Sequence, residues 1–581
     1  MPRSTLSTTQ ERRSALEARH PAWVCRTTAG LLDSVAAGHP DRPFLLTDGA
    51  PVTYAAMVAW SERLAAGLLR LGVRPGDKVA VDIANVPEVV ALRFAVSRIG
   101  AVAVSVNIQL RRDELGYVLR QSRARVLVTM DRFRDLDYLT ELDHIAPGWD
   151  RRPRGRAGGV DLPELREVLV HGMAGTAPRG IPFTELDGGG ELAMAPAGDP
   201  GDVSDILYTS GTTGKPKGVQ LSHDALLRTA YSSALTRAFA DGWRVLFALP
   251  LHHVFGYVEG LLAAMFVGGA VCLHATFDPV RMLGDVGAHR IDELICIPSM
   301  TSALVSHARA GRYDLASLST MFSSGGPHPA SLWTDTIEVL GVEEVFTAYG
   351  QTETTASTVC TRPGDPLDRL TGTNGAPKPA GVAGDPTLGG LLAEYAVRDL
   401  FTGADLPRGE TGELVVRGPA VTRGYYEKPE ETAATFTADG WLRTGDLGHV
   451  DDQGYLVLTG RRRDTYRCGG ELVMPAEVEH LLMSHPGVAD AHVVGIPDNR
   501  MGEVGCAWVV LDEGVGSPTA EDLLEYCRER LARFKVPVTI FFCATDELPR
   551  TATGKVRKHL LAQWTSARLR DAAGRPARTP R

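Results

Sequence analysis

Short apolar runs alternate with amphipathic stretches along the N-terminal part of this 581-residue chain. Residues 78–84, 101–106 and 125–130 have the length and the apolar content of buried strands, whereas residues 87–99 and 114–121 between them have helical spacing. Strands that are separated by helices pair in parallel, and the helices then cover both faces of the sheet. The sequence therefore predicts an α/β fold in which mostly parallel sheets are layered with helices.

Four further apolar runs, at residues 245–250, 294–298, 320–323 and 345–348, each end in small or polar residues. In an open α/β sheet, ligands bind at the carboxyl ends of the strands. A single loop rich in Gly and Ser after a strand is common and carries little information. Because four such loops occur in one part of the chain, we expect them to line one shared cleft.

The stretch of residues 208–223, YTSGTTGKPKGVQLSH, is crowded with groups that bind anions. Glycines let backbone N–H groups turn toward a phosphate, hydroxyls donate further hydrogen bonds, and lysines bring positive charge. A flexible linker is disfavoured because strand-like residues, 205–208 and 219–221, flank the stretch. The phosphate loop of kinases and ATPases is excluded because its second glycine would fall on Pro216. The stretch thus predicts a polyphosphate-binding loop of another kind.

This loop resembles, nearly letter for letter, the phosphate loop of the adenylate-forming enzymes, which include acyl-CoA and aryl-CoA ligases, firefly luciferase and the adenylation domains of peptide synthetases. Later motifs of that family are present as YGQTE at residues 349–353, WLRTGD at 441–446 and PRTATGK at 549–555. The resemblance covers residues 40–560 and points to the acyl-CoA ligase branch. It implies that ATP, with Mg²⁺ as cofactor, activates a carboxylic acid as acyl-AMP, and that coenzyme A then accepts the acyl group.

The resemblance also implies a role for individual side chains. The nucleotide-binding residues are expected to be Thr209, Ser210, Gly211, Thr212, Thr213, Lys217, Ser324, Gly325, Gly326, Tyr349, Gly350, Asp446 and Arg461. The catalytic residues are expected to be Lys555, Thr352, Glu353 and His253. Glu353 and Thr212 are the expected Mg²⁺ ligands, in keeping with the preference of this hard cation for oxygen. Asp446 is expected to accept hydrogen bonds from the ribose hydroxyls.

Two further sets of residues follow from the same resemblance. The acyl pocket is expected to be lined by His253, Val254, Phe255, Gly256, Tyr257 and Ser299. Asp464 is the expected hinge between two domains, and Gly469 and Gly470 are expected to border the channel for coenzyme A. The domains expected are a large one over residues 1–460 and a small α+β lid over residues 461–565, with a disordered tail over residues 566–581.

The sequence departs from the family pattern at three places. Residues 379–390, PAGVAGDPTLGG, form an insertion beside the expected nucleotide site. Leu472 stands where many acyl-CoA ligases have asparagine, and His252 stands where the family usually has an aromatic residue. The first two bear on the handling of ATP, and the third bears on the shape of the pocket mouth.

Composition excludes several other classes of function. The net charge of −9 is small for this length and gives no reason to expect a nucleic-acid partner. The eight cysteines include no C-x-x-C pair, which argues against a disulfide framework or a zinc site and fits a cytoplasmic location. The longest apolar run, residues 261–273, is too short to span a membrane and is expected to be a buried helix that turns into a strand.

Some alternatives stay open at the level of sequence. The motifs allow an enzyme that performs only the transfer from a preformed adenylate, a ligase that loads a carrier protein, or a luciferase-like oxygenase. A binding protein that has lost turnover is disfavoured because Lys217, Glu353, Asp446 and Lys555 are all present. A fatty, aryl or alicyclic acid suits the apolar pocket equally well. The oligomeric state is open, with a homodimer as one option.

Overall fold

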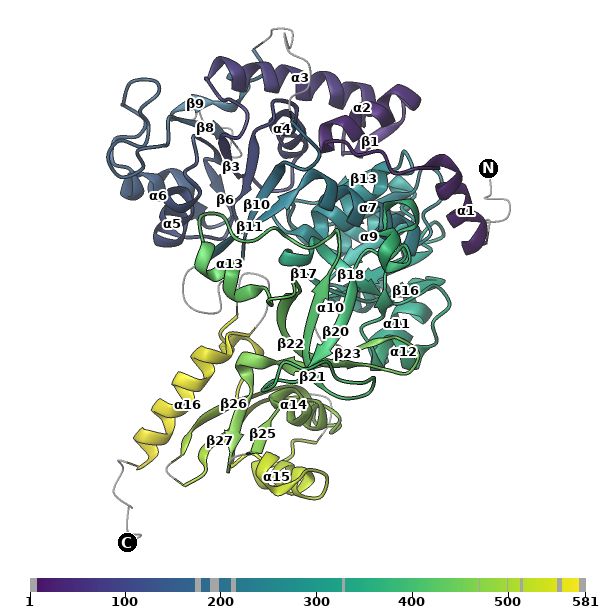
Figure 1. Ribbon diagram of the computed structural model, residues 1–581, viewed down its shortest axis with the longest axis vertical. Coiled ribbons are helices and arrows are strands. Elements are labelled where there is room, and N and C mark those ends of the chain that lie inside the picture. The colour runs from purple at the N-terminus through teal and green to yellow at the C-terminus, as the bar shows by residue number, and fades with distance from the viewer. Residues whose placement is uncertain are drawn as a thin grey trace. The chain divides into compact units, whose positions relative to one another are not determined.

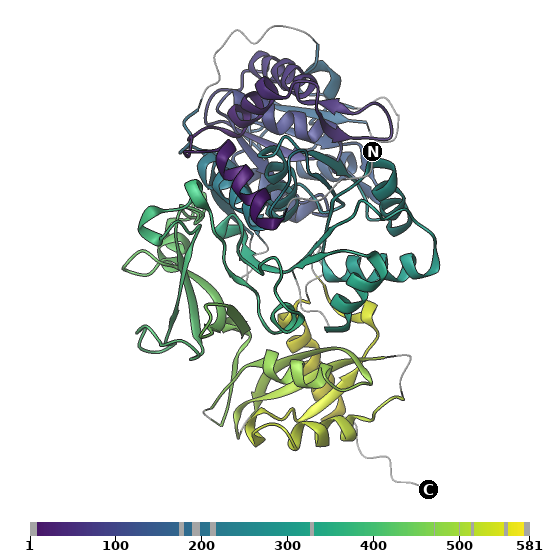
Figure 2. The same cartoon turned by 90° about the vertical axis from the view of Figure 1, so that its right-hand side faces the viewer.

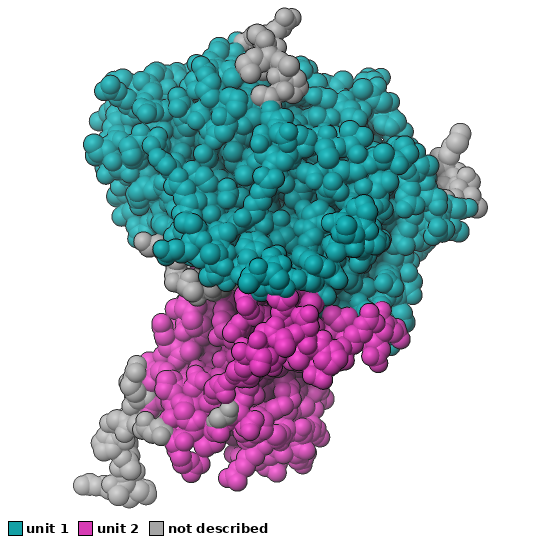
Figure 3. Space-filling view, viewed as in Figure 1, with its two compact units in different colours: residues 1–395, 416–442, 454–456 teal, residues 396–415, 443–453, 457–581 magenta. Residues whose placement is uncertain are grey.

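The computed structural model describes residues 8–172, 179–188, 198–209, 216–325, 330–469, 471–498, 500–512, 516–550 and 556–573. The chain forms two compact units (Figure 3). Unit 1 comprises residues 1–395, 416–442 and 454–456, and unit 2 comprises residues 396–415, 443–453 and 457–581. The domain boundary expected at residue 460 stays a prediction. None of the helices within the described ranges combines the length and the hydropathy that a membrane span requires.

The first sheet of unit 1 has the strand order β16-β15-β14-β12-β13-β1-β2 (Figure 1). Its strands are β1 (Pro43–Leu46), β2 (Val52–Thr53), β12 (Arg244–Phe247), β13 (Ala270–Leu273), β14 (Glu293–Cys296), β15 (Thr320–Ser323) and β16 (Glu344–Phe346). All neighbours pair in parallel except β1 and β2. The four apolar runs singled out in the sequence therefore become adjacent strands β12, β14, β15 and β16, and their carboxyl ends meet at one edge of this sheet.

The second sheet has the order β11-β10-β4-β3-β5-β8-β9. Its strands are β3 (Lys78–Asp82), β4 (Val102–Ser105), β5 (Val126–Met130), β8 (Glu167–His171), β9 (Ile181–Pro182), β10 (Val203–Thr209) and β11 (Lys217–Ser222). The pairing is parallel throughout except between β10 and β11. These two strands flank the glycine-rich loop on both sides, as the sequence predicted, and Thr209 pairs with Lys217 where the loop begins and ends.

Helices form three layers around these two sheets (Figures 1 and 2). The middle layer shares one apolar core with both sheets and contains α2 (Thr28–Gly38), α3 (Tyr54–Arg70), α4 (Pro87–Arg98), α7 (His223–Thr236), the π-helix η2 (Phe255–Leu262) and α8 (Ala263–Met265). The outer layers are α9 (Pro279–His289), α10 (Pro298–Ala310) and α11 (Ala330–Leu340) on the first sheet, and α5 (Arg112–Ser122) and α6 (Tyr138–Ile145) on the second. The layered α/β architecture is thus confirmed.

Shorter elements complete unit 1. They include α1 (Thr9–Arg19), β6 (Arg132–Phe133), β7 (Leu136–Asp137), η1 (Phe183–Glu185), β17 (Ala348–Gln351), η3 (Thr352–Thr354), β18 (Ala356–Cys360), α12 (Leu367–Gly372), β19 (Ala376–Pro377) and α13 (Pro429–Thr435). The insertion at residues 379–390 forms two short turns, η4 (Gly381–Ala383) and η5 (Pro386–Leu388). It is held on α7, where Arg228 donates to the carbonyl oxygen of Ala383 at 2.7 Å and Ser232 donates to that of Pro379 at 2.8 Å.

A four-stranded sheet of order β20-β21-β22-β23 contributes residues to both units. Its strands are β20 (Glu394–Arg398), β21 (Gly412–Arg417), β22 (Leu442–Val450) and β23 (Leu456–Arg461). Unit 2 also has a sheet of order β25-β24-β27-β26 with β28 beside β27, built from β24 (Tyr466–Cys468), β25 (Glu471–Val473), β26 (Val488–Asp498), β27 (Gly502–Leu511) and β28 (Thr539–Phe542). Around it are η6 (Arg462–Asp464), α14 (Pro475–Met483), α15 (Ala520–Arg528), η7 (Arg533–Lys535), η8 (Thr545–Glu547) and α16 (Lys558–Ala573).

Helix α16 differs from the expectation for the C-terminal tail. Residues 566–573 continue this helix, although their composition led us to expect disorder from residue 566 onward. The physical reason lies in contacts that a count of apolar residues does not reveal. Leu569 packs against the core of unit 2, and the Arg568 guanidinium lies 4.5 Å from the centre of the Trp508 ring.

Candidate active site

The end of the glycine-rich loop and the expected cation ligand are joined by one tyrosine. The Lys217 ammonium lies 4.8 Å from the centre of the Tyr425 ring, and the Tyr425 hydroxyl donates a hydrogen bond of 2.9 Å to Oε1 of Glu353. Burial, together with the neighbouring Glu353 carboxylate, raises the pKa of Tyr425, so this phenol stays a donor. One tyrosine therefore contacts both groups: the Lys217 ammonium lies near its ring, and the Glu353 carboxylate accepts from its hydroxyl.

Backbone contacts hold this arrangement. Residues Val219 and Tyr425 form an antiparallel bridge, and the N–H of Gln220 donates to the carbonyl oxygen of Gly424 at 3.1 Å. The carbonyl oxygen of Glu353 accepts from the N–H of Thr422 at 2.8 Å. Three segments that are far apart in sequence thus meet through main-chain hydrogen bonds, which makes the site insensitive to the flexibility of single side chains.

The turn that carries Thr352 and Glu353 is strained. Thr355 and Ala356, which follow the short helix η3, have φ of 56° and 91°, values that residues other than glycine seldom adopt. A side chain at Gly350 would put its Cβ 1.9 Å from the carbonyl oxygen of Ala356. Strain of this kind persists where the surroundings over-determine the backbone, and it is enriched at functional sites.

Three of the expected nucleotide-binding residues, Ser324, Gly325 and Tyr349, also come together in unit 1. The Ser324 hydroxyl, just after β15, donates to the carbonyl oxygen of Ala348 at 2.5 Å and accepts from the N–H of the same residue at 3.3 Å. Tyr349 follows on β17, with its ring centre 6.1 Å from that of Tyr395. Gly325 has a φ of 103°, which favours glycine at this position. The loop after β15 and the strand β17 therefore lie side by side and are joined by hydrogen bonds.

The expected acyl-pocket residues lie at the start of the π-helix η2. His253 precedes the helix, its ring centre 5.6 Å from that of His252, and burial together with His253 and Arg93 lowers the pKa of His252. Phe255 meets Phe322 edge to face at 5.1 Å. Long π-helical segments are rare and are often found at functional sites. The sequence predicted a buried helix only from residue 261, near the end of η2, and it did not predict the π geometry.

The other expected pocket residues differ in burial and in the groups that they contact. A side chain at Gly256 would put its Cβ 2.8 Å from the carbonyl oxygen of Leu249, so a small residue is needed there. The Tyr257 ring is buried, with the Arg93 guanidinium 3.7 Å from its centre. Val254 is buried, whereas Ser299 is exposed in the first turn of α10. Their role as a pocket lining stays a prediction.

A buried ionic cluster lies beneath these segments and was not foreseen from the sequence. The Lys378 ammonium contacts both carboxylate oxygens of Glu259, at 3.0 and 3.1 Å, and the same carboxylate accepts from the backbone N–H of Ser357 at 3.0 Å. Arg237 lies 3.6 Å from Glu259 and also pairs with Glu293. Burial alone would raise the pKa of Glu259, but Lys378 and Arg237 outweigh it and hold this pKa below its usual value.

The cluster connects the two halves of the expected site. Glu259 belongs to η2, which begins with the expected pocket residues, and Ser357 on β18 lies opposite Gly350 on β17. The charged residues of the cluster are spread from Arg237 to Lys378 and show no sequence pattern that marks them as partners. The one available signal was Glu259, a single charged residue among the otherwise uncharged residues 254–267.

In unit 2, two of the expected nucleotide-binding residues form an ion pair. Nε of Arg461 lies 3.2 Å from Oδ1 of Asp446, and the preceding Gly445 has a φ of 71°. Asp464 lies in the short helix η6, 3.4 Å from Nε of Arg463. Gly469 has a φ of 63°, and a side chain there would approach Met501 within 2.8 Å. The carboxylate on a glycine turn that the sequence predicted is therefore present.

Several expected site residues lie outside the described ranges. They are Ser210, Gly211, Thr212, Thr213, Gly326, Gly470 and Lys555. Their roles stay predictions from the sequence. Tyr425, in contrast, is described and joins the site without having been expected, because its place beside Glu353 depends on a contact between residues 72 positions apart.

Comparison with known proteins agrees with this geometry. Residues 32–426 match the AMP-binding enzyme family, and residues 477–555 match the AMP-binding enzyme C-terminal domain. The chain belongs to the AMP-binding enzyme family, and relatives named as acyl-CoA synthetases and CoA ligases, 34–36% identical over most of the chain, assign it to the acyl-CoA ligase branch. The expected class, an AMP-forming acid–thiol ligase, is thereby confirmed.

Individual relatives cover nearly the whole chain. One relative is a CoA ligase of Mycobacterium tuberculosis whose name gives the acyl group as a methyl-dioxo-octahydro-indenyl propanoyl group. Its sequence is 36% identical to this one, over 94% of this chain and 98% of the relative. A feruloyl-CoA synthase of Amycolatopsis is 35% identical over 88% of this chain and 93% of its own. The o-succinylbenzoate CoA synthetase of Bacillus subtilis, solved with its acyl-adenylate intermediate, is 30% identical over 92% of this chain and 98% of its own, with a TM-score of 0.75.

Replacing Tyr425 with phenylalanine is expected to slow acyl-adenylate formation about tenfold, because it removes the hydrogen bond to Glu353 but keeps the ring beside Lys217. The rate is measured as pyrophosphate release. Tyr426→Phe is the matched control, since the Tyr426 hydroxyl donates only a long hydrogen bond of 3.4 Å to the exposed Glu427 among the described residues, and its loss should change the rate little. Equal rates for Tyr425→Phe and the parent enzyme would remove Tyr425 from the site.

Replacing Asp446 with alanine is expected to weaken binding of both ATP and acyl-adenylate by about 10–100-fold, the range for a hydrogen bond to a charged group. Both ligands retain the ribose, so both should be affected. Titration calorimetry measures the two affinities. Asp405→Ala, which removes a carboxylate paired with Arg398 at 3.0 Å in the same unit, is the control. Unchanged affinities for the Asp446 variant would move ribose recognition elsewhere.

Proposed function

We propose that this acyl-CoA ligase takes a carboxylic acid with a bulky apolar body, uses ATP with Mg²⁺ to form its acyl-adenylate, and transfers the acyl group to coenzyme A rather than to a carrier protein. The observation that carries the proposal is the contact chain from Lys217 through Tyr425 to Glu353. This contact chain supports a site in which Lys217 binds the phosphates and Glu353 binds the cation of one triphosphate.

The residues around Glu353 fit a bound Mg²⁺. One oxygen of this carboxylate accepts from the Tyr425 hydroxyl, which orients the group as a hard oxygen ligand. When bound, Mg²⁺ would neutralise charge on the phosphates. Thr212 remains the second ligand expected from the sequence.

The proposed chemistry is a transfer in two steps. A carboxylate oxygen of the acid attacks the α-phosphorus of ATP, and the bond from that phosphorus to the bridging oxygen breaks, so that pyrophosphate leaves with the electron pair. Lys217 and the loop hydroxyls hold the leaving phosphates, and Lys555 stabilises charge near the α-phosphate. The thiol of coenzyme A then releases its proton to solvent and attacks the acyl carbon. The bond from that carbon to the phosphate oxygen breaks, AMP leaves with the electron pair, and Asp446 keeps the ribose in place.

The preference for an apolar acid rests on the η2 segment. Phe255, Val254 and Gly256 supply apolar surface, and His253 is the polar group nearest to the start of the helix. Apolar pockets with a few polar groups bind such ligands well. The relatives named for indenyl-propanoyl and feruloyl products support a ring-containing acid.

A panel of fatty, aryl and alicyclic acids tests the proposal, with ATP and Mg²⁺ and with or without coenzyme A. Mass spectrometry should detect acyl-AMP without coenzyme A and acyl-CoA with it, most of all for ring-containing acids. A second series supplies synthetic acyl-adenylate with coenzyme A. An enzyme that works only in the second series would be restricted to the transfer step, and ATP would be withdrawn as a substrate.

A further inference from the structure

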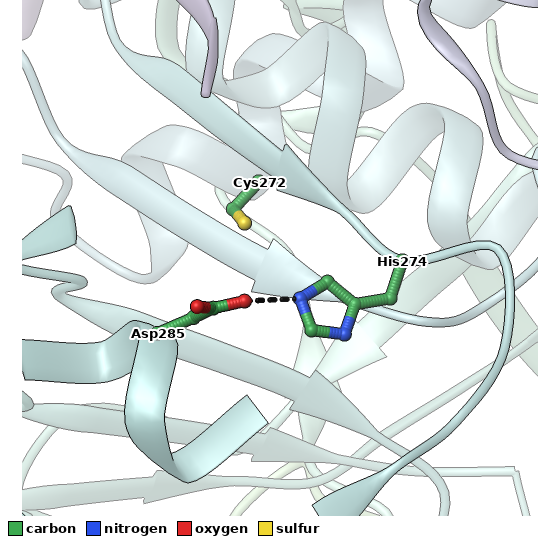
Figure 4. Close-up of side chains that lie close together, drawn as sticks. All are labelled: Cys272, His274 and Asp285. Atoms are coloured by element: carbon green, nitrogen blue, oxygen red, sulfur yellow. Dashed lines mark hydrogen bonds and ion pairs between the residues drawn. The ribbon is translucent and has the colours of Figure 1, made fainter. Parts of the chain in front are cut away.

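Three potential metal ligands converge at the end of strand β13, away from the residues of the proposed active site (Figure 4). Cys272 lies on β13 and His274 follows two residues later, so both side chains lie on the same face of the strand. Asp285 comes from α9, which packs on that face. One ligand atom from each of these residues lies within 4.8 Å of the other two.

The trio sits on rigid, buried elements with one side toward solvent. Cys272 and His274 are 3% and 2% exposed, and the Asp285 side chain is 18% exposed. Nε2 of His274 lies 2.8 Å from Oδ2 of Asp285, whereas Nδ1 is buried and has no hydrogen-bond partner among the described residues. Figure 4 shows Nε2 turned toward Asp285 and Nδ1 turned away from both Asp285 and Cys272, so an ion between the three residues would bind Nε2 in place of this hydrogen bond.

We propose that Cys272, His274 and Asp285 bind a divalent cation of the zinc class. Thiolate, imidazole and carboxylate are all ligands that Zn²⁺ accepts, and three protein ligands leave a fourth position for water. The two negative charges of the thiolate and the carboxylate balance the charge of the ion. Mg²⁺ does not favour a thiolate, so the cation of the ATP reaction would not compete for this site.

A neighbouring arginine, Arg281, is expected to lower the affinity of this site for a cation. Nε of Arg281 lies 3.7 Å from Oδ2 of Asp285, and Nη2 of the same residue contacts both carboxylate oxygens of Asp48 at 2.8 Å. Its positive charge opposes a cation at Asp285 but can stay with Asp48 when the ion binds. Arg281→Gln should therefore tighten cation binding, which a purely hydrogen-bonded His274–Asp285 pair would not predict.

The site also connects to the turn before the expected acyl pocket. The carbonyl oxygen of His274 accepts from Nδ2 of Asn85 at 3.2 Å, and the same amide donates to the carbonyl oxygen of Leu249 at 2.8 Å. Oδ1 of Asn85 accepts from the N–H of Leu251 at 2.9 Å. An ion at His274 would thus restrain, through Asn85, the turn that leads to His253.

Cobalt provides the test, because Co²⁺ bound to a thiolate absorbs in the near ultraviolet. The full-length protein is stripped with a chelator and titrated with Co²⁺ in the presence of excess Mg²⁺. We expect a charge-transfer band that saturates at one equivalent, disappears on addition of Zn²⁺, is absent in Cys272→Ser and needs more than tenfold more Co²⁺ in Asp285→Asn. Cys296→Ser, which alters a buried cysteine on the nearby strand β14, should keep the band.

Thermal unfolding supplies a second readout that does not depend on the band. Zn²⁺ should raise the Tm of the parent protein, because it binds only the folded state, and should raise that of Asp285→Asn much less. If Cys272→Ser fails to fold, the parent and Asp285→Asn decide the question. A parent protein with neither a band nor a Tm shift, or a band that persists in both variants, would overturn the proposal.

Discussion

Replacing Lys217 with alanine is expected to slow acyl-adenylate formation by about 10²–10³-fold, the usual cost of removing one preorganised charge or donor from a transition state. Lys217 is the first residue of β11, where pairing with Thr209 fixes its backbone. Its ammonium already lies near the Tyr425 ring, whose hydroxyl donates a hydrogen bond to Glu353. The charge is therefore already oriented in the folded protein and does not have to be oriented during the reaction.

Lys78→Ala is the matched control, because the Lys78 ammonium lies 5.0 Å from the centre of the next ring, Tyr426. It should change the rate by no more than about twofold, as most surface substitutions do. Transfer from supplied acyl-adenylate should survive in Lys217→Ala, since the β- and γ-phosphates are then absent. Normal adenylation by Lys217→Ala, or equal losses in both variants, would refute the assignment of Lys217 to the phosphates.

Replacing Glu259 with glutamine is expected to lower the free energy of unfolding by about 3–5 kcal/mol, the cost of removing one partner of a buried ion pair. The new side chain is nearly the same size, so little packing is lost. The charges of Lys378 and Arg237 would remain buried with less compensation, because both contact the Glu259 carboxylate. Denaturant unfolding followed by tryptophan fluorescence measures the change.

Two further variants separate charge from packing. Glu394→Gln removes one partner of an exposed pair with Arg417, at 2.7 Å, and should cost at most about 1 kcal/mol. The double variant Glu259→Gln, Lys378→Met removes a charge of each sign and should recover part of the loss. If Glu259→Gln costs no more than Glu394→Gln, the buried cluster does not stabilise this fold.

Local pattern was enough to predict the layered fold and the family. The runs that became β3, β4 and β5 are mostly apolar, with Lys78 and Asp82 only at the ends of β3, because both faces of a parallel sheet are covered. The glycine-rich loop between β10 and β11 and the loops after β12, β14, β15 and β16 are each likewise contiguous in sequence. Such features depend only on residues that are close together in sequence, so they can be recognised in a single sequence.

Contacts between distant segments were decided only by the tertiary structure. Nothing local in the sequence pairs Tyr425 with Glu353, or Lys378 with Glu259, because these contacts depend on where folded segments meet. The π geometry of η2 and the helical continuation of α16 past residue 565 depend in the same way on packing. The sequence by itself determined the chemistry that the site carries, whereas the tertiary structure decided which side chains hold that chemistry in place, since burial and charge compensation exist only in the folded chain.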